Sequence, residues 1–116
     1  MPRVFIPQEP IRRNPETGVM ERSINLSSAE TYGDLVFVYP PGQIPKDSRA
    51  VIPSVEGMMN DITEEDYLLP VGNPALIALT AAYMAGYTNK LKLLVWRNDL
   101  RRYDVFQGRV FGEEQP

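Results

Sequence analysis

Residues 67–96 read YLLPVGNPALIALTAAYMAGYTNKLKLLVW, and this stretch decides the fold. It opens and closes with short runs of β-forming apolar residues, 67–71 and 91–96, and the residues between them are typical of a helix. A continuous apolar run is characteristic of a strand that is buried on both faces. Two such strands joined by a helix predict a parallel pair with a right-handed crossover. We therefore expect a strand, helix, strand unit at the heart of an α/β domain.

The helix inside this unit has well-defined predicted ends. Asn73 is a favoured N-cap residue, and Pro74 suits the first helical position. Gly86 predicts the end of the helix, because glycine readily adopts the left-handed conformation found there. The body, 75–85, contains no charged residue, although a surface helix normally has a polar face. We therefore expect this helix to be covered on nearly every side.

The sequence leaves open what covers the helix. One answer lies within the chain, where the N-terminal ribbon or a short helix near residues 52–60 could pack on it. The other answer is a second copy of the protein, which the small residues of the helix would allow to approach closely. We favour the second answer and predict a homo-oligomer, since closed symmetric dimers are the commonest assembly. The residues expected at this interface are Met58, Met59, Ala78, Ala82 and Tyr83.

The rest of the chain predicts further elements around this unit. A run of β-formers predicts a central strand at 35–39, and the residues after the turn at 97–101 predict an antiparallel edge strand. The predicted fold is a small three-layer α/β domain with a largely parallel central sheet (35–39, 67–71, 91–96), an antiparallel edge (102–107) and an N-terminal β-ribbon. We expect one domain over residues 1–116, with a ribbon or arm at 1–26, an α/β core at 33–111 and a flexible tail at 112–116.

Prolines divide the N-terminal segment. Pro7 and Pro10 interrupt two short extended segments, 3–6 and 11–13, and proline is tolerated in strands mainly at sheet edges. Residues 14–18 have the composition of a turn. This pattern predicts a hairpin ribbon, and an exposed arm of this kind often wraps a partner subunit.

A short helical turn is predicted between the ribbon and the strand at 35–39. Ser27 and Glu30 have the spacing of a capping box, in which each side chain bonds a backbone amide near the other residue. Gly33 would close the turn in a left-handed conformation.

Composition excludes several classes of function. The chain has 116 residues, 12 basic and 15 acidic, with a net charge of −3, which argues against a protein that coats nucleic acid. Its apolar runs are far shorter than the roughly 20 residues needed to cross a bilayer, and its beginning lacks the apolar region of a signal peptide. We expect a cytoplasmic protein with no membrane partner.

The absence of two residue types limits the chemistry further. Without cysteine there is no disulfide or thiolate nucleophile, and without histidine there is no imidazole base and no histidine metal ligand. Catalysis would have to use carboxylates, lysine, tyrosine or hydroxyl groups, or a magnesium-like ion held by oxygens. We therefore expect no cofactor, no metal and no catalytic residues, and the sequence leans away from an enzyme.

Three features could still bind a ligand. Gly72 and Asn73 lie where a strand ends and a helix begins, which is where open α/β sheets bind anions, although simple helix capping also explains them. Arginines beside Trp96 and Tyr103 are typical of stacking and phosphate binding, although charged hairpin tips also serve solubility. The arginines concerned are Arg97, Arg101 and Arg102.

The third feature is the acidic run 64–66, which could hold a magnesium ion or form an acid and base pair. Adjacent carboxylates on one turn point in different directions, whereas a metal site needs ligands that converge from separate elements. We therefore interpret this run as a solvated turn.

After the predicted N-terminal ribbon, the chain contains AETYG at 29–33, DYLLPVGNP at 66–74 and LLVWR at 93–97. This order of parts resembles that of small uncharacterised proteins of bacteriophages and plasmids, which, if a phage encodes the protein, implies a place in the host cytoplasm. The resemblance implies no known activity and no site residues. It favours an accessory or host-interaction role.

Two hypotheses of function follow. The first is a small non-catalytic protein, possibly phage-encoded, that binds a protein partner or a second copy of itself. The alternative is a protein that binds a small molecule or nucleotide with the strand-end loop 72–74 and arginines of the last hairpin. Nucleic acid is not expected as a partner.

Overall fold

The computed structural model describes residues 2–22, 25–42 and 45–112. In chain order its elements are β1 (Arg3–Gln8), β2 (Ile11–Arg13), β3 (Met20–Arg22), the 3-10 turn η1 (Ala29–Thr31), β4 (Asp34–Tyr39), the 3-10 turn η2 (Ser48–Ala50), α1 (Val51–Met59), β5 (Tyr67–Leu68), α2 (Pro74–Thr88), β6 (Lys90–Arg97) and β7 (Arg102–Arg109).

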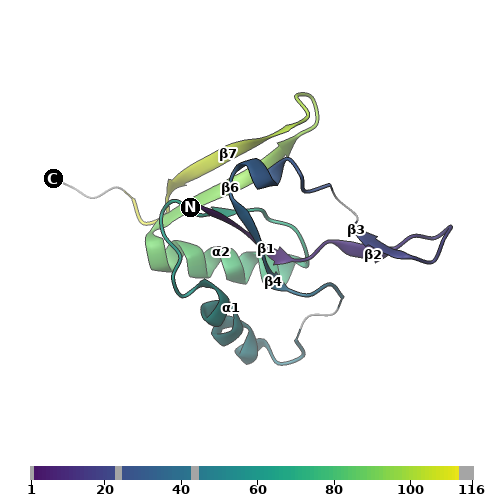
Figure 1. The fold of residues 1–116 in the computed structure, drawn as a ribbon. Coiled ribbons are helices and arrows are strands. Elements are labelled where there is room, and N and C mark those ends of the chain that lie inside the picture. The colour runs from purple at the N-terminus through teal and green to yellow at the C-terminus, as the bar shows by residue number, and fades with distance from the viewer. Residues whose placement is uncertain (1, 23–24, 43–44, 113–116) are drawn as a thin grey trace.

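A five-stranded sheet forms the centre of the molecule, with the strand order β4-β1-β5-β6-β7 (Figure 1). The first four strands are parallel, and β7 pairs antiparallel with β6. Strands β2 and β3 form a separate two-stranded antiparallel ribbon. The predicted α/β fold, with a largely parallel sheet, an antiparallel edge and a ribbon, is confirmed.

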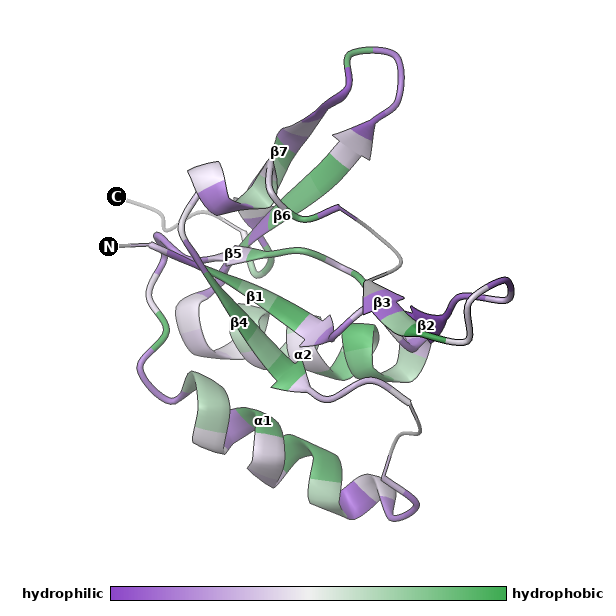
Figure 2. Ribbon diagram, turned by 45° about the vertical axis from the view of Figure 1, so that its right-hand side comes forward, coloured by the Kyte–Doolittle hydropathy of each residue, from purple (hydrophilic) through white to green (hydrophobic). Residues whose placement is uncertain are grey.

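The direction of each crossover decides what covers each face of the sheet. The connections from β4 to β5 and from β5 to β6 cross the sheet in the same direction, so right-handed crossovers place α1 and α2 on one face. The connection from β1 to β4 runs the other way and lies on the opposite face (Figure 2). Leu26, Ala29 and Tyr32 of this connection pack against that face. The second outer layer is therefore an irregular segment with one 3-10 turn rather than a helix.

Strand β1 corrects the expectation that residues 1–26 form only a ribbon or arm. It lies between β4 and β5, and Val4, Phe5 and Ile6 are completely buried. Pro7 favoured an edge position in the sequence, because proline in a strand usually marks a sheet edge. In the structure the pairing of β1 with β5 ends at Phe5 and Leu68, so Pro7 lies beyond the end of that ladder.

Two local expectations about turns are also corrected. Helix α2 begins as predicted, but it continues through Gly86 to Thr88, and Asn89 forms the left-handed C-cap with φ of 58°. Glycine in a helix is unfavourable but tolerated when tertiary packing holds the helix. The predicted capping box of Ser27 and Glu30 does not start η1, because the N-cap residue of this turn is Ser28, which makes no side-chain cap hydrogen bond.

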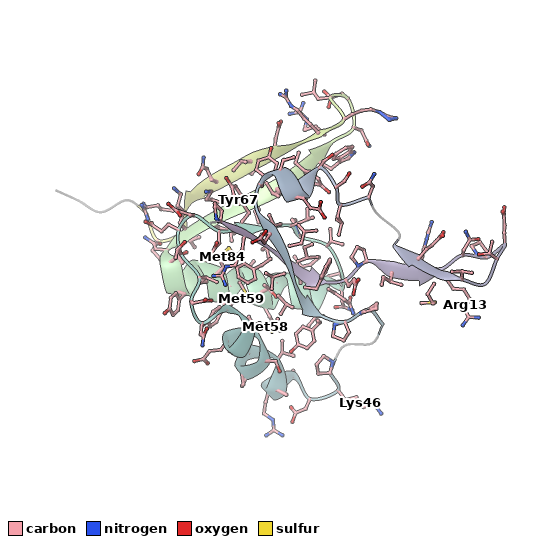
Figure 3. The ribbon with its side chains drawn as sticks, in the orientation of Figure 1. Arg13, Lys46, Met58, Met59, Tyr67 and Met84 are labelled. Atoms are coloured by element: carbon pink, nitrogen blue, oxygen red, sulfur yellow. The ribbon has the colours of Figure 1, made fainter. Side chains whose placement is uncertain are left out.

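The chain itself covers one side of α2 and leaves other residues of the helix exposed, so the expected cover on nearly every side is not met within one copy. The sheet buries Leu76 and Met84 on one side of the helix, and α1 packs against it with Val55 and Met59. Figure 3 labels Met59 and Met84 in this contact.

The residues predicted at an oligomer interface are divided by this packing. Met59 is completely buried inside the protein, and Tyr83 is half-buried and stacks on Tyr87. Met58, Ala78 and Ala82 remain exposed. An interface at these three residues stays a prediction.

Within the part of the chain that the structure describes, no helix is long and apolar enough to cross a membrane.

Candidate functional site

The carboxyl edge of the parallel strands is the candidate functional site. Strand β1 lies between β4 and β5, the connection from β1 to β4 runs one way across the sheet and the connection from β4 to β5 runs the other way. Open α/β sheets bind ligands at the carboxyl ends of strands around such a reversal. Two hollows lie along this edge. The larger, about 750 Å³, is lined by Asn25, Ser28, Leu69, Pro70, Val71, Leu94, Val95, Trp96, Arg101 and Tyr103. The smaller, about 440 Å³, is lined by Gln8, Glu9, Pro10, Ile11, Gly42, Val71 and Gly72.

The larger cavity has an apolar floor and an aromatic wall. Leu69, Leu94 and Tyr103 are buried in the core on the η1 face of the sheet. The rings of Trp96 and Tyr103 meet edge to face, with centroids 5.0 Å apart. The indole N–H of Trp96 donates to Oδ1 of Asn98 at 2.8 Å, which holds the indole in position. Burial raises the pKa of the Tyr103 hydroxyl above its ordinary value, so this ring is neutral at physiological pH.

Arg101 differs electrostatically from the two other arginines of the last hairpin. Arg97 pairs with Asp104 at 2.9 Å and with Asp99 at 3.2 Å, and Arg102 pairs with Asp104 at 3.4 Å. Arg101 lines the larger cavity and has no ion-pair partner among the residues that the structure describes. The tip of the hairpin therefore presents one uncompensated positive charge to this cavity.

The polar rim of the larger cavity comes from the connection between β3 and η1. Asn25 and Ser28 contribute to its lining. Oδ1 of Asn25 accepts a hydrogen bond from the backbone N–H of Ser27 at 2.9 Å. Because Ser28 does not cap η1, its hydroxyl is not used by the helical turn.

Gln8 occupies the position where the sequence predicted a ligand at Gly72 and Asn73. Its Oε1 accepts from the backbone N–H of Asn73 at 2.9 Å, and its Nε2 donates to the carbonyl of Gly42 at 2.8 Å. Oδ1 of Asn73 accepts from the N–H of Ala75 at 2.8 Å, as expected of an N-cap. Two amides at the start of α2 are thus satisfied from within the chain.

Gly72 is required by the same arrangement. Its φ is 125°, and a Cβ placed there would lie 2.5 Å from the Cβ of Gln8. Close packing explains this glycine without a ligand, although a ligand at 72–74 stays a prediction.

The structure separates the residues that the sequence grouped into one ligand site. Arg101 joins Trp96 and Tyr103 in the larger cavity, whereas Gly72 lines the smaller hollow. Gln8 could not be identified from the sequence, because a glutamine at the end of an apolar run does not show whether its side chain points inward. The same holds for the lining residues that come from other segments of the chain, namely Asn25, Ser28, Leu69, Pro70 and Val71.

The interpretation of the acidic run 64–66 as a solvated turn is wrong for Asp66, which has a structural role. Asp66 is buried and accepts from the backbone N–H groups of Arg3 and Thr63, each at 2.9 Å, and it pairs with the Arg3 guanidinium at 3.2 Å. Glu64 pairs with Arg109, which holds the pKa of the Glu64 carboxyl below its ordinary value. Among the described residues no group of three acidic, histidine or cysteine side chains is placed to hold a metal ion.

Comparison with known proteins places the chain in a family. The model of a family described as "Phage Pam3 gp32-like protein" matches residues 2–109. No curated protein and no solved structure matches the chain.

Proposed function

Because the chain belongs to the Phage Pam3 gp32-like protein family, we propose that it is a phage accessory protein that acts by binding a protein partner, and that the β2–β3 ribbon makes the contact. The place of action in this proposal is the host cytoplasm. The partner is either another protein or a second copy of the chain.

The projecting ribbon carries this proposal. It extends away from the sheet and helices, as Figures 1 and 2 show, and Figure 3 labels Arg13 on its outer part. The described hydrogen bonds of residues 12–21 all stay within the ribbon. Val19 and Met20 are 59% and 55% exposed.

A ribbon of this kind has little reason to be ordered alone. An isolated two-stranded hairpin is marginally stable in water, because it buries too little apolar surface to offset the entropy of ordering its chain. Docking on a partner would bury Val19 and Met20 and would supply the missing stabilisation. The ribbon therefore supports a binding function better than a role in the stability of the domain.

The test uses a ribbon variant and a matched control. The variant carries Val19→Asp and Met20→Asp, and the control carries Glu16→Gln at the exposed turn of the same ribbon. Each protein is measured by light scattering at high micromolar concentration, and each is immobilised for capture from a phage-infected host lysate.

We expect the wild type and the control to form an oligomer or to retain the same protein from the lysate, and the double variant to lose this contact at unchanged thermal stability. The proposal fails if the wild type is monomeric and retains nothing, or if the double variant binds as well as the control.

Small-molecule binding is a second candidate function. The observation that favours it is the larger cavity with its uncompensated Arg101, rather than the loop 72–74.

A further inference from the structure

We propose that the larger cavity at the carboxyl ends of β5 and β6 binds a small molecule in which a flat ring carries one anionic group. This site would act independently of the ribbon. Its size of about 750 Å³ lies within the range of roughly 300–1,000 Å³ that is usual for small-molecule sites.

The walls of the cavity suit a flat apolar ring. Trp96 presents an accessible aromatic surface, and the buried Tyr103 and the rigid ring of Pro70 belong to the same lining. Trp96 is 43% exposed, although its neighbour Leu94 in the same lining is buried. Its indole is nevertheless held by Asn98 and by the edge of the Tyr103 ring. A large aromatic group that is both accessible and fixed in orientation loses little freedom when a ligand stacks on it.

The charge of the cavity selects an anion. The hairpin tip brings together three arginines and two aspartates, and the aspartates pair with Arg97 and Arg102. Arg101 remains uncompensated among the described residues, and a guanidinium binds a carboxylate or phosphate through paired hydrogen bonds. The Asn25 amide and the Ser28 hydroxyl lie in the same lining and can bond further polar atoms of the ligand.

One free guanidinium also limits the size of the anion. Binding a long polyanion depends on several cations that together displace its counterions. The chain instead has a net charge of −3, which repels a polyanion as a whole. The cavity therefore favours a ligand with a single anionic group.

Fluorescence of Trp96 gives a direct test, because the chain contains one tryptophan and it lines the cavity. The full chain is titrated with two anionic probes, adenosine 5′-monophosphate and phenylacetate. Their uncharged counterparts, adenosine and phenylacetamide, are titrated in parallel. The variants are Arg101→Gln and, as the matched control from the same hairpin, Arg102→Gln.

We expect a saturable change with at least one anionic probe, and binding roughly tenfold weaker for its uncharged counterpart and for Arg101→Gln, because each loses a charge-assisted hydrogen bond. Arg102→Gln should bind as the wild type does. Response to the nucleotide alone or to phenylacetate alone identifies whether the anion is a phosphate or a carboxylate.

Three results would overturn the proposal. The first is no saturable change with either anionic probe up to millimolar concentration. The second is equal affinity for the charged and uncharged members of both pairs. The third is unchanged affinity in Arg101→Gln while its circular dichroism spectrum matches that of the wild type. None of these measurements involves a protein partner, so their failure leaves the ribbon proposal standing.

Discussion

Replacing Gly72 by alanine should destabilise the protein, whereas the same change at Gly86 should stabilise it. A Cβ at Gly72 would lie 2.5 Å from the Cβ of Gln8 and 3.2 Å from its backbone nitrogen, and the φ of 125° is unfavourable for alanine. At Gly86, which lies inside α2, an added Cβ meets nothing within 4 Å.

The size of each effect follows from these contacts. A residue held in such a backbone conformation costs about 1–3 kcal/mol. Displacing Gln8 also weakens its hydrogen bonds to Asn73 and Gly42, each worth about 0.5–1.5 kcal/mol. We therefore expect Gly72→Ala to lower the free energy of unfolding by about 2–5 kcal/mol. Gly86→Ala should raise it by about 0.5–1 kcal/mol, because alanine is the better helix former.

Equilibrium unfolding in urea, followed by Trp96 fluorescence and by circular dichroism, measures both effects. The midpoint should move in opposite directions for the two variants, with unchanged dependence on denaturant concentration. The reasoning would be refuted if Gly72→Ala lay within about 0.5 kcal/mol of the wild type, or if Gly86→Ala were the more damaging change.

Three further predictions use the same unfolding measurements. Phe5→Ala should lower the free energy of unfolding by about 3–5 kcal/mol, because Phe5 is completely buried in the central strand. Val19→Ala on the ribbon should lower it by less than about 0.5 kcal/mol. Similar losses in the two variants would contradict the placement of β1. Asn73→Ala should cost about 1 kcal/mol through loss of the N-cap bond to Ala75, and an unchanged urea midpoint would show that this cap contributes nothing. Arg109 lowers the pKa of Glu64 in the folded protein. The stabilisation from this pair is therefore present above the ordinary pKa of 4.5 and is lost as the pH falls through the lower pKa of the folded state. Glu64→Gln should lose less stability than the wild type on acidification, and parallel pH profiles of the free energy of unfolding would contradict this prediction.

The two proposed sites belong to different parts of the molecule. The ribbon follows the carboxyl end of β1, whereas the larger cavity lies at the carboxyl ends of β5 and β6, next to the last hairpin, and no residue of β2 or β3 lines it. A protein partner and a small ligand could therefore be tested separately, and each variant set perturbs one site alone.

The extent of each element was predictable wherever local chemistry decides it. The start of α2 followed from Asn73 and Pro74, because capping and a preset φ act within a few residues. Strand β5 is shorter than the predicted 67–71, since pairing ends at Leu68. Whether an apolar run continues as a strand depends on its neighbours in the sheet, and these are distant in the sequence.

The candidate site shows the same division. The sequence identified Arg97, Arg101 and Arg102 beside aromatic residues, but it could not tell which of them is neutralised. Asp104 of β7 lies opposite Val95 of β6 and forms an ion pair with Arg97. Arg101, in the lining of the larger cavity, has no such partner among the described residues. Ion pairs across strands depend on register, which no local pattern of residues specifies.

By itself the sequence determined the α/β class, the strand, helix, strand unit at 67–96 and the boundary where α2 begins, because hydrophobic periodicity and capping are local properties of the chain. Only the tertiary structure decided that β1 is a central strand, that Gln8 satisfies the amide at the start of α2, and that α1 covers one side of this helix. These outcomes depend on contacts between residues far apart in the sequence, and such contacts exist only once the sheet has assembled.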